Sequence, residues 1–309
     1  MSGVELRLYT HPACLAHDTG EGHPERPARL NAVLDALAAR FPELVPRQAP
    51  RAERDALLRV HAPELLAAVL ETQPGADLHW LDPDTALSPG SAEAALRAAG
   101  AVVAATDWVM DGERRRAFCA VRPPGHHAEP ATAMGFCLFD NVAVAAAHAF
   151  AAHGLQRIAI ADFDVHHGNG TQAIFEREPR LLFVDSHQMP LYPGTGAASE
   201  NGVGNIANAP YPPLSNGADV RALWQDALLP RLEAFAPQLL FVSAGFDAHR
   251  DDPLAQGLLD ADDFAWITTR LAAVADRHAH GRIVSTLEGG YDLAALAASA
   301  VAHVGALHG

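Results

Sequence analysis

Short apolar runs alternate with longer stretches along the chain, and the two patterns predict different elements. In most short runs the apolar residues are continuous rather than alternating, as expected for strands that are buried on both faces of a parallel sheet. These predicted strands are residues 5–9, 117–121, 157–164, 180–186, 238–245 and 282–290. The longer stretches predict helices near residues 26–40, 91–110, 140–153, 217–235, 260–278 and 292–307. Because strands alternate with helices, we predict a doubly wound α/β sheet.

Two long loops rich in Pro and Gly follow predicted strands, at residues 122–135 and 189–217. Their positions favour functional loops over free linkers between domains. In open α/β sheets, ligands bind at the carboxyl ends of the strands. The candidate functional residues are therefore those that end each strand.

The chain has the bulk composition of a compact globular protein. Its 309 residues are 49% hydrophobic and 19% charged, which excludes a disordered chain and leaves one or two domains open. The formal net charge of −15 disfavours nucleic acid as a partner and favours cationic ligands. The same acidic excess is also typical of a surface that only keeps a protein soluble.

Cysteines and apolar segments bear on the location of the protein. Cys14, Cys119 and Cys137 lack the spacing of a metal site or of a disulfide framework, which favours a reducing, cytoplasmic environment. The N-terminal segment has no basic stretch followed by an apolar one, so we expect no secretory signal. The apolar stretch at 293–307 is short and interrupted by polar residues, which favours a core helix over a membrane span.

Polar residues alternate at the end of the strand predicted at 157–164. Asp162, Asp164 and His166 are two residues apart, so in an extended backbone their side chains point the same way. Asp247, which follows another predicted buried strand, is the best candidate for a third metal ligand beside Asp164 and His166. Two carboxylates and one imidazole leave a position open for water, which is typical of catalytic zinc. Taken singly, each acid is more often a turn or cap residue.

Two further segments place candidate acid–base groups after predicted strands. RPPGHH puts His126 and His127 after a Pro-Pro-Gly turn, where neighbouring imidazoles could act as general acid and base on a metal-activated water. LEGGY puts Tyr291 after two glycines, and its hydroxyl could hydrogen-bond a developing oxyanion. Alone, the histidine pair is more often a packing feature and the tyrosine a turn aromatic.

Other site motifs fit less well. The sequence has no HExxH, GxSxG or GxxxxGK[ST] motif. Residues 168–173 match GxGxxA, and Asp185 ends the next predicted strand, which is a pattern of dinucleotide-binding loops. However, three residues separate Asp164 from the first glycine, and this interpretation leaves the acidic and histidine motifs unexplained.

A set of motifs in order along nearly the whole chain resembles the histone deacetylase superfamily, and most closely its class II and bacterial amidohydrolase branch. The motifs are HPERPARL (23–30), DTALSPGSAEAALRAAG (84–100), RPPGHH (122–127), GFCLFDN (135–141), DFDVHHGNGTQ (162–172), LYPGTG (191–196), SAGFDAHRDDPL (243–254) and LEGGY (287–291). Such an ordered set is highly specific.

The resemblance implies one catalytic domain over residues 1–309 with the arginase-deacetylase fold, a mainly parallel eight-stranded α/β sheet flanked by helices. It implies one catalytic zinc ion bound by Asp164, His166 and Asp247. The implied reaction removes an acetyl or similar small acyl group from an acyl-lysine-like amine by means of metal-activated water.

By the same resemblance, His126 and His127 form a tandem pair and Tyr291 is the catalytic tyrosine. Asp162 is expected to orient His126, and Asn169 to be the hydrogen-bond partner of His127. A neutral amide stabilises a protonated imidazole less than a carboxylate does, which favours His127 as the neutral general base. A protonated histidine, for which His127 is the first choice, then delivers a proton to the leaving amine.

The resemblance also implies a substrate tunnel. Phe136 and Tyr192 match the two aromatic positions that flank an acyl-lysine chain in the family, and Gly135 precedes the first of them. Tyr192 is usually Phe, which makes this tunnel slightly more polar. Leu254 occupies the place where the polyamine-specific branch has a glutamate, which argues against a dedicated acetylpolyamine deacetylase.

A structural potassium ion and self-association are further expectations from the family. Its potassium site draws on Asp162, Asp164 and His166 and on residues 185–187, where Asp-Ser-His replaces the common Ser-Leu-His. We therefore expect K⁺ but leave its ligands open, and bacterial relatives suggest a homo-oligomer. Three alternatives remain: a deacetylase of small amines such as polyamines, a non-catalytic acyl-lysine binding module, and an arginase-like enzyme with two manganese ions.

Overall fold

The central feature of the protein is one large sheet. A computed structural model describes residues 3–75 and 77–309, and its eight-stranded sheet has the strand order β2-β1-β5-β10-β9-β6-β7-β8. Every neighbouring pair in this sheet is parallel. The strands are β1 Glu5–Thr10, β2 Arg47–Gln48, β5 Arg115–Cys119, β6 Ile158–Asp162, β7 Leu181–Asp185, β8 Ile206–Asn208, β9 Leu239–Ala244 and β10 Ile283–Leu287.

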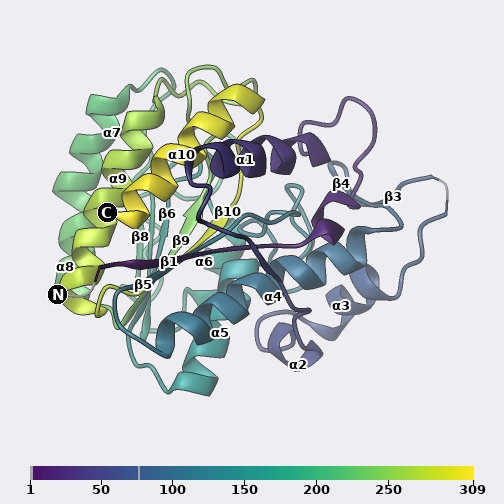
Figure 1. Ribbon diagram of the computed structural model, residues 1–309, viewed down its shortest axis with the longest axis horizontal. Helices are drawn as coiled ribbons and strands as arrows, with labels where there is room; N and C mark the ends of the chain where they lie inside the picture. The colour runs from purple at the N-terminus through teal and green to yellow at the C-terminus, as the bar shows by residue number, and fades with distance from the viewer. Residues whose placement is uncertain (1–2, 76) are drawn as a thin grey trace.

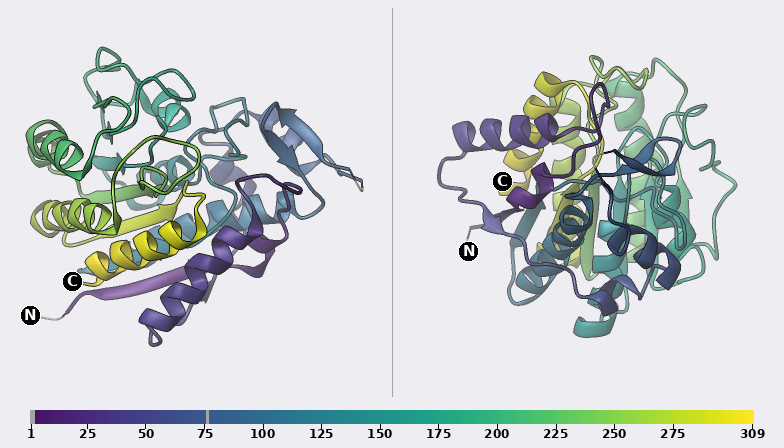
Figure 2. Two further views of the ribbon diagram at one scale, coloured as in Figure 1. Left: turned by 90° about the horizontal axis from the view of Figure 1, so that it is seen from above. Right: turned by 90° about the vertical axis from the view of Figure 1, so that its right-hand side faces the viewer.

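Helices cover both faces of the sheet (Figures 1 and 2). On one face, α1 (Pro27–Arg40) and α9 (Ala261–His278) both pack against α10 (Leu293–His308). On the other face, α4 (Ser91–Met110) packs against α5 (Asn141–His153). The central strands are buried on both sides, which explains why their sequences are apolar at successive positions.

Shorter elements surround this core. They are a 3-10 turn at Pro12–Leu15 and the helices α2 Arg54–Leu57, α3 Pro63–Leu70, α6 Asn169–Phe175, α7 Gly217–Leu223 and α8 Leu229–Phe235. A π-helical turn at Trp224–Leu228 joins α7 to α8 just before Pro230, which cannot donate a helix hydrogen bond. An antiparallel hairpin of β3 (His79–Asp82) and β4 (Thr85–Leu87) projects beside the main sheet (Figure 2).

The structure confirms the α/β class, the parallel eight-stranded sheet and the main helices. The strand expected at 117–121 lies two residues earlier, as β5. The strand expected at 157–164 ends at Asp162, because the chain turns there to form the loop described below. The sequence analysis missed α2, α3, β2, β8 and the β3–β4 hairpin, which are too short to show a clear hydrophobic period.

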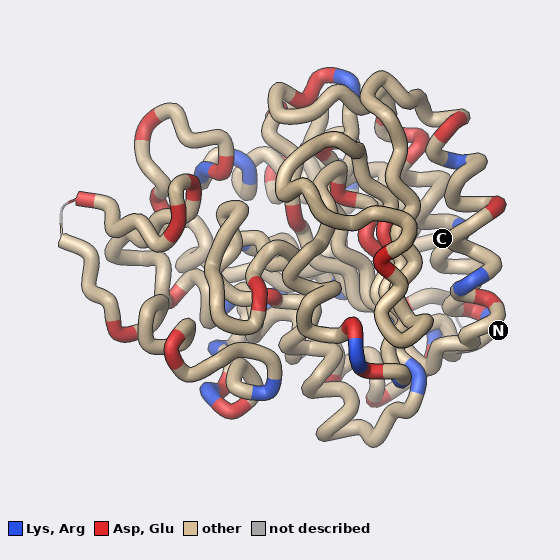
Figure 3. Tube along the Cα trace, turned by 180° about the vertical axis from the view of Figure 1, so that it is seen from behind, with Lys and Arg blue, Asp and Glu red and all other residues tan. Residues whose placement is uncertain are grey.

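The charge distribution, the cysteines and the helix lengths do not identify a binding partner. Acidic positions are spread over the trace in Figure 3, and basic ones occur among them rather than in one large group. Cys14, Cys119 and Cys137 are buried and free. No helix in the described part of the chain is long and apolar enough to cross a membrane.

Candidate functional site

Four neighbouring strands bring the candidate residues to one edge of the sheet. β5, β10, β9 and β6 are adjacent and parallel, so the loops that follow them emerge side by side. These loops carry the RPPGHH segment, the LEGGY segment, Asp247, and the segment that contains Asp164 and His166. The topology therefore gathers residues that are far apart in the sequence, as expected for an α/β sheet.

Asp164, His166 and Asp247 form a buried group, which we call the inner triad. One ligand atom from each lies within 4.8 Å of the others. Nδ1 of His166 is 3.1 Å from Oδ1 of Asp164 and 3.1 Å from Oδ2 of Asp247. Asp164 and Asp247 are fully buried, and His166 is 8% exposed. The sequence had placed these three together, and the structure does the same.

The local geometry differs from the extended strand that the alternating pattern predicted. β6 ends at Asp162, and that expectation was wrong for the residues beyond it. Oδ1 of Asp162 accepts a hydrogen bond from the Asp164 amide at 3.0 Å, and Oδ1 of Asp164 accepts one from the His166 amide at 2.9 Å. Short aspartate side chains favour such turns. The turns of this loop, rather than the alternation of side chains along a strand, therefore orient the ligand side chains.

Backbone groups fix the two carboxylates of the inner triad. The Val165 amide donates to Asp247 at 2.9 Å, and the Gly289 amide donates to Asp164 at 2.8 Å. A Cβ atom at Gly245 would overlap Asp164, and one at Gly289 would overlap Asp247. Glycine at these two positions lets the backbone approach the carboxylates closely.

The charge of the inner triad attracts a cation. Burial lowers the pKa of His166, but its hydrogen bonds with Asp164 and Asp247 outweigh that effect and raise it to about 10. Burial and the charge of Asp164 raise the pKa of Asp247. Two carboxylates and one imidazole are ligands of zinc and of similar divalent metals. The donor set, its burial and its convergence fit a metal ion.

The tandem histidines occupy different electrostatic environments. Nδ1 of His126 is 3.0 Å from Asp162, whereas Nδ1 of His127 donates to Asn169 at 2.8 Å, and the two rings lie 4.0 Å apart. Burial lowers the pKa of His126, but the charges of Asp162 and Asp164 raise it well above its usual value. Burial and the positive charge of His126 hold the pKa of His127 well below its usual value.

Glu288 is a site residue that the sequence analysis missed. Its buried carboxylate accepts hydrogen bonds from the amides of Gly125 at 2.7 Å and His126 at 3.2 Å. Burial raises its pKa to about 7. Glu288 thereby joins the LEGGY loop to the tandem-histidine loop. The signal was an acid in LEGGY at the end of a buried strand.

Tyr291 is held by residues from two other segments. Its amide donates to Asp252 at 2.7 Å, and the Arg29 guanidinium lies 4.8 Å above its ring. Arg29 also donates to the carbonyls of Glu288 and Gly290, at 2.5 and 2.6 Å. Burial raises the pKa of Tyr291 well above its usual value, so its hydroxyl stays protonated. The HPERPARL motif thus supports the LEGGY loop, a role the sequence did not reveal.

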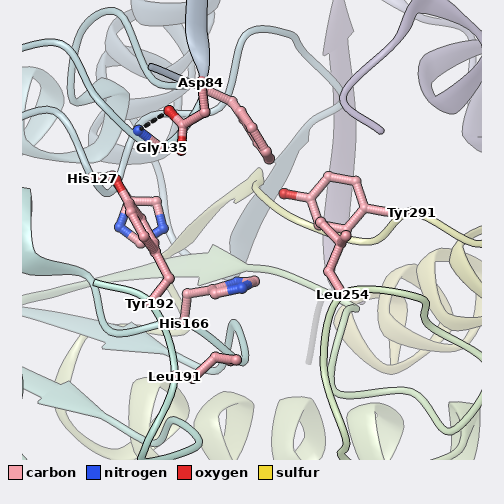
Figure 4. Close-up of a pocket in the computed structure, with 9 residues that line it drawn as sticks. Asp84, His127, Gly135, His166, Leu191, Tyr192, Leu254 and Tyr291 are labelled. Carbon is pink, nitrogen blue, oxygen red and sulfur yellow. Dashed lines mark hydrogen bonds between the residues drawn. The ribbon is translucent and has the colours of Figure 1, made fainter. Parts of the chain in front are cut away.

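A pocket of about 230 Å³ reaches His166 of the inner triad. In Figure 4, His127, His166 and Tyr291 face this pocket from different sides, and the Tyr291 hydroxyl points into it. All four residues expected to contact substrate line it. The complete lining is Asp84, His127, Gly135, Phe136, His166, Leu191, Tyr192, Leu254 and Tyr291.

The pocket wall at Gly135 and Phe136 depends on two neighbours that the sequence did not single out. Asp84 accepts a hydrogen bond from the Gly135 amide at 3.2 Å, and the Thr85 hydroxyl accepts one from the Phe136 amide at 3.0 Å. Gly135 has φ +56°, and a Cβ atom there would overlap the His127 ring. Leu191 was also missed, although it lies in the LYPGTG motif.

Comparisons with known proteins agree with this geometry. A family model described as "Histone deacetylase domain" matches residues 23–307. The chain belongs to the histone deacetylase family. It is similar to a "Histone deacetylase-like amidohydrolase" of Pseudomonas aeruginosa, with 41% identity over 91% of this chain and 74% of the relative. A "Probable deacetylase" of Archaeoglobus fulgidus is 37% identical over 92% of this chain and 80% of the relative.

The fold comparison gives the same result. The crystal structure of the "HDA15 HD domain" superposes with a TM-score of 0.93 and 36% identity, over 99% of this chain and 89% of that chain. This histone deacetylase family member therefore has the arginase-deacetylase fold that the motifs had suggested. Its family is one of deacetylases and related amidohydrolases.

The dinucleotide-loop interpretation of residues 168–173 does not suit the structure of this family member. A Cβ atom at Gly170 would overlap Ala128, so the loop packs against the tandem-histidine segment. Asp185 accepts a hydrogen bond from the Gly168 amide at 2.9 Å and contacts His187 at 2.8 Å. The glycines allow this close packing, and the Asp185 side chain points into the protein.

Proposed function

We propose that this histone deacetylase family member is a zinc-dependent amidohydrolase, which removes an acetyl or similarly small acyl group from an acyl-lysine-like amine. The observation that carries the proposal is that His166 of the inner triad lines the same pocket as His127 and Tyr291. A metal ligand, a base and a hydroxyl donor around one pocket support amide hydrolysis. We assign this activity to a single domain, residues 1–309.

Asp164, His166 and Asp247 would hold the zinc ion. When bound, zinc supplies a Lewis acid that polarises the acyl carbonyl and acidifies the attacking water. The backbone amides that fix the two carboxylates keep the ligands in place without the metal. The remaining chemistry belongs to the side chains around the pocket.

His127 would move the proton. Its Nδ1 is engaged by Asn169, so Nε2 is the nitrogen that can take a proton from the attacking water. Its lowered pKa means that it starts neutral and can act as a base. When the carbon–nitrogen bond breaks, the same nitrogen returns the proton to the leaving amine, and the acyl group leaves as a carboxylic acid. His126, paired with Asp162, stays protonated beside it.

Tyr291 would stabilise the charge that develops on the acyl oxygen. Its hydroxyl points into the pocket and remains protonated, so it can donate a hydrogen bond to an oxyanion. Arg29 and Asp252 orient the tyrosine from outside the pocket. Removal of a single donor of this kind usually lowers kcat by about 10²–10³.

The pocket walls suit an aliphatic arm. Phe136, Leu191, Tyr192 and Leu254 provide most of the lining beside the catalytic side chains. The main alternative substrate is a small acetylated amine such as a polyamine: Leu254 offers a second ammonium group no anionic partner, and Asp84 is the one acidic residue of the described lining. We also propose that the protein prefers acyl-lysine substrates and binds a potassium ion. The proposal further includes self-association, a cytoplasmic location and no binding of nucleic acid.

Fluorogenic acetyl-lysine and trifluoroacetyl-lysine amides test the proposal. We expect the zinc-loaded protein to hydrolyse them, and both a chelator and Tyr291→Phe to remove most of the activity. Acetylated spermidine in competition separates the two substrate classes. If zinc-loaded protein hydrolyses none of these amides, the proposal is wrong and the binding-module alternative is favoured.

A further inference from the structure

A second group of side chains of the types that bind metals lies near the surface, between α4 and α5. Asp107 of α4 and His148 and His153 of α5 each offer one ligand atom, and these atoms lie within 4.8 Å of one another. Nε2 of His148 is 2.7 Å and Nε2 of His153 is 2.8 Å from the same oxygen, Oδ1 of Asp107. We call these residues the outer triad.

The composition of α5 makes this convergence informative. Apart from its first residue, Asn141, and its two histidines, the helix consists of Ala, Val and Phe. The two ionisable side chains of the helix therefore meet at one carboxylate of the neighbouring helix. Packing alone does not require imidazoles on a solvent-facing surface, where Ala or Gln would serve α5 equally well.

The electrostatics at this point favour a cation. Asp107 lies in the last turn of α4, which ends at Met110, and His153 is the last residue of α5. Both helices thus present the negative ends of their dipoles to the outer triad. The Asp107 carboxylate supplies the anionic ligand and lies between the two imidazoles.

Exposure leaves space for additional ligands. The Asp107 side chain is 53% exposed, and those of His148 and His153 are 17% and 23% exposed. Zinc with bonds of about 2.0–2.1 Å separates its ligand atoms by about 3.3 Å in a tetrahedron. The contacts to Asp107 would lengthen by about 0.5 Å, which small rotations of exposed side chains permit, and water would complete the coordination.

We propose that Asp107, His148 and His153 form a second metal site, which takes a divalent transition-metal ion such as Zn²⁺ or Cu²⁺ and links α4 to α5. The site is independent of the proposed reaction. Its role is structural, because it joins the two helices that cover one face of the sheet and does not line the pocket.

Zinc stoichiometry tests the site. The 309-residue chain is stripped with a chelator, equilibrated with Zn²⁺ by dialysis and analysed by elemental mass spectrometry. We expect two equivalents for the wild type and one for His148→Gln/His153→Gln. As a matched control, His278→Gln removes a single imidazole that contacts Glu233 at 2.8 Å, and it should retain two equivalents.

Variants of the inner triad separate this proposal from the proposed function. Asp247→Asn should bind one equivalent and the triple variant Asp247→Asn/His148→Gln/His153→Gln none. If Asp247→Asn leaves the count unchanged while His148→Gln/His153→Gln lowers it, the outer site stands and the inner one fails. If wild type and His148→Gln/His153→Gln bind equal zinc, the outer site is wrong.

Two further measurements do not depend on counting zinc. Cu²⁺ added to Asp247→Asn should give an electron paramagnetic resonance spectrum with coupling to two nitrogens, which Asp247→Asn/His148→Gln/His153→Gln should lack. Zn²⁺ at a hundredfold excess over Kd should raise the Tm of Asp247→Asn by about 4 °C. Asp107→Asn in that background preserves shape and both histidines, and should lose this shift. An unaltered spectrum or shift in these variants would overturn the proposal.

Discussion

The inner and outer triads contain the same kinds of donors in opposite settings. Asp164, His166 and Asp247 are buried at the ends of β6 and β9, and backbone amides hold both carboxylates. In the outer triad, Asp107 meets two imidazoles between two helices, and all three side chains are partly exposed. The difference lies in what surrounds the ligands rather than in their chemistry.

That difference explains why only one triad suits catalysis. Burial strengthens electrostatic interactions and keeps bulk water from competing with the substrate. Fixed backbone donors keep the inner ligands in place before a metal binds. Among the residues that the structure describes, the outer triad has neither property. The same kinds of ligand side chains therefore form a reactive site only where burial, fixed hydrogen bonds and catalytic neighbours accompany them.

The largest contrast should come from equivalent substitutions in the two triads. Asp247→Asn is expected to lower hydrolysis of the acetyl-lysine amide by at least about 10³-fold, because the inner metal is lost. Asp107→Asn should keep kcat/KM within about twofold, since surface changes away from the site have small effects. Steady-state kinetics with metal analysis checks both. Comparable losses in the two variants would remove the distinction.

The next contrast lies within the pocket. Tyr291→Phe should lower kcat by about 10²–10³ with zinc content unchanged, because a donor to the oxyanion is lost. Tyr192→Phe removes the hydroxyl of another pocket tyrosine and should change kcat less than about threefold, since Tyr192 is given no role in charge stabilisation. Equal effects of the two substitutions on kcat would contradict the role given to Tyr291.

Buried histidines outside the pocket should make the fold sensitive to acid. Burial lowers the pKa of His303 to about 3, below the unfolded value of about 6.5. Between these values the unfolded state binds the extra proton, so His303 costs stability progressively as pH falls below 6.5. His303→Gln should reduce the pH slope of unfolding free energy by about 1.4 kcal/mol per pH unit between pH 6 and 4.

Urea unfolding at several pH values measures this slope. The exposed His280 is the matched control, because His280→Gln should leave the slope unchanged. His17 and His61 are also buried with pKa values lowered to about 4, so part of the slope should persist in His303→Gln. A slope that is identical in His303→Gln and wild type would count against the buried neutral imidazole.

The partner of His127 should set the acid side of the pH profile. Asn169→Asp places a carboxylate on Nδ1 of His127 and is expected to raise its pKa, moving the acid limb of kcat/KM upward by about one pH unit. Asn169 also donates to Glu129 at 2.8 Å, so Asn169→Asp is best measured together with Glu129→Gln. An acid limb that stays in place would exclude His127 as the base.

We expect the smallest effect on stability from substitutions in the metal-free outer triad. His148→Gln/His153→Gln in the stripped protein should cost less than about 1 kcal/mol, because exposed ion pairs contribute little. Urea unfolding in a chelator gives this value. A loss of several kcal/mol would mean that the outer histidines are part of the folded core rather than a metal link.

Sequence patterns predicted the elements and site residues whose positions follow from the order of residues over a short segment. Buried strands such as β6 and β9 are apolar at most positions, and Asp164, His166 and Asp247 stand out beside them because packing gives no reason for their polarity. The strand extending to residue 164 was wrong, because Asx turns ended it at Asp162.

Contacts between distant segments could not be predicted in this way. Glu288 supports the tandem-histidine loop 162 residues earlier, and the outer triad joins residues 41 and 46 positions apart. Neither contact has a local pattern. Short elements such as β8 also escaped, because three residues show no period. These features depend on tertiary packing, which brings the loops and helices together.

The central claim is that one metal ion in the inner triad makes this pocket hydrolytic. Its most direct test is a zinc titration of stripped His148→Gln/His153→Gln, with hydrolysis of the acetyl-lysine amide measured at each point. We predict that activity rises linearly and stops at one equivalent of zinc per chain. Full activity in the stripped protein, or no activity with one equivalent bound, would contradict the claim.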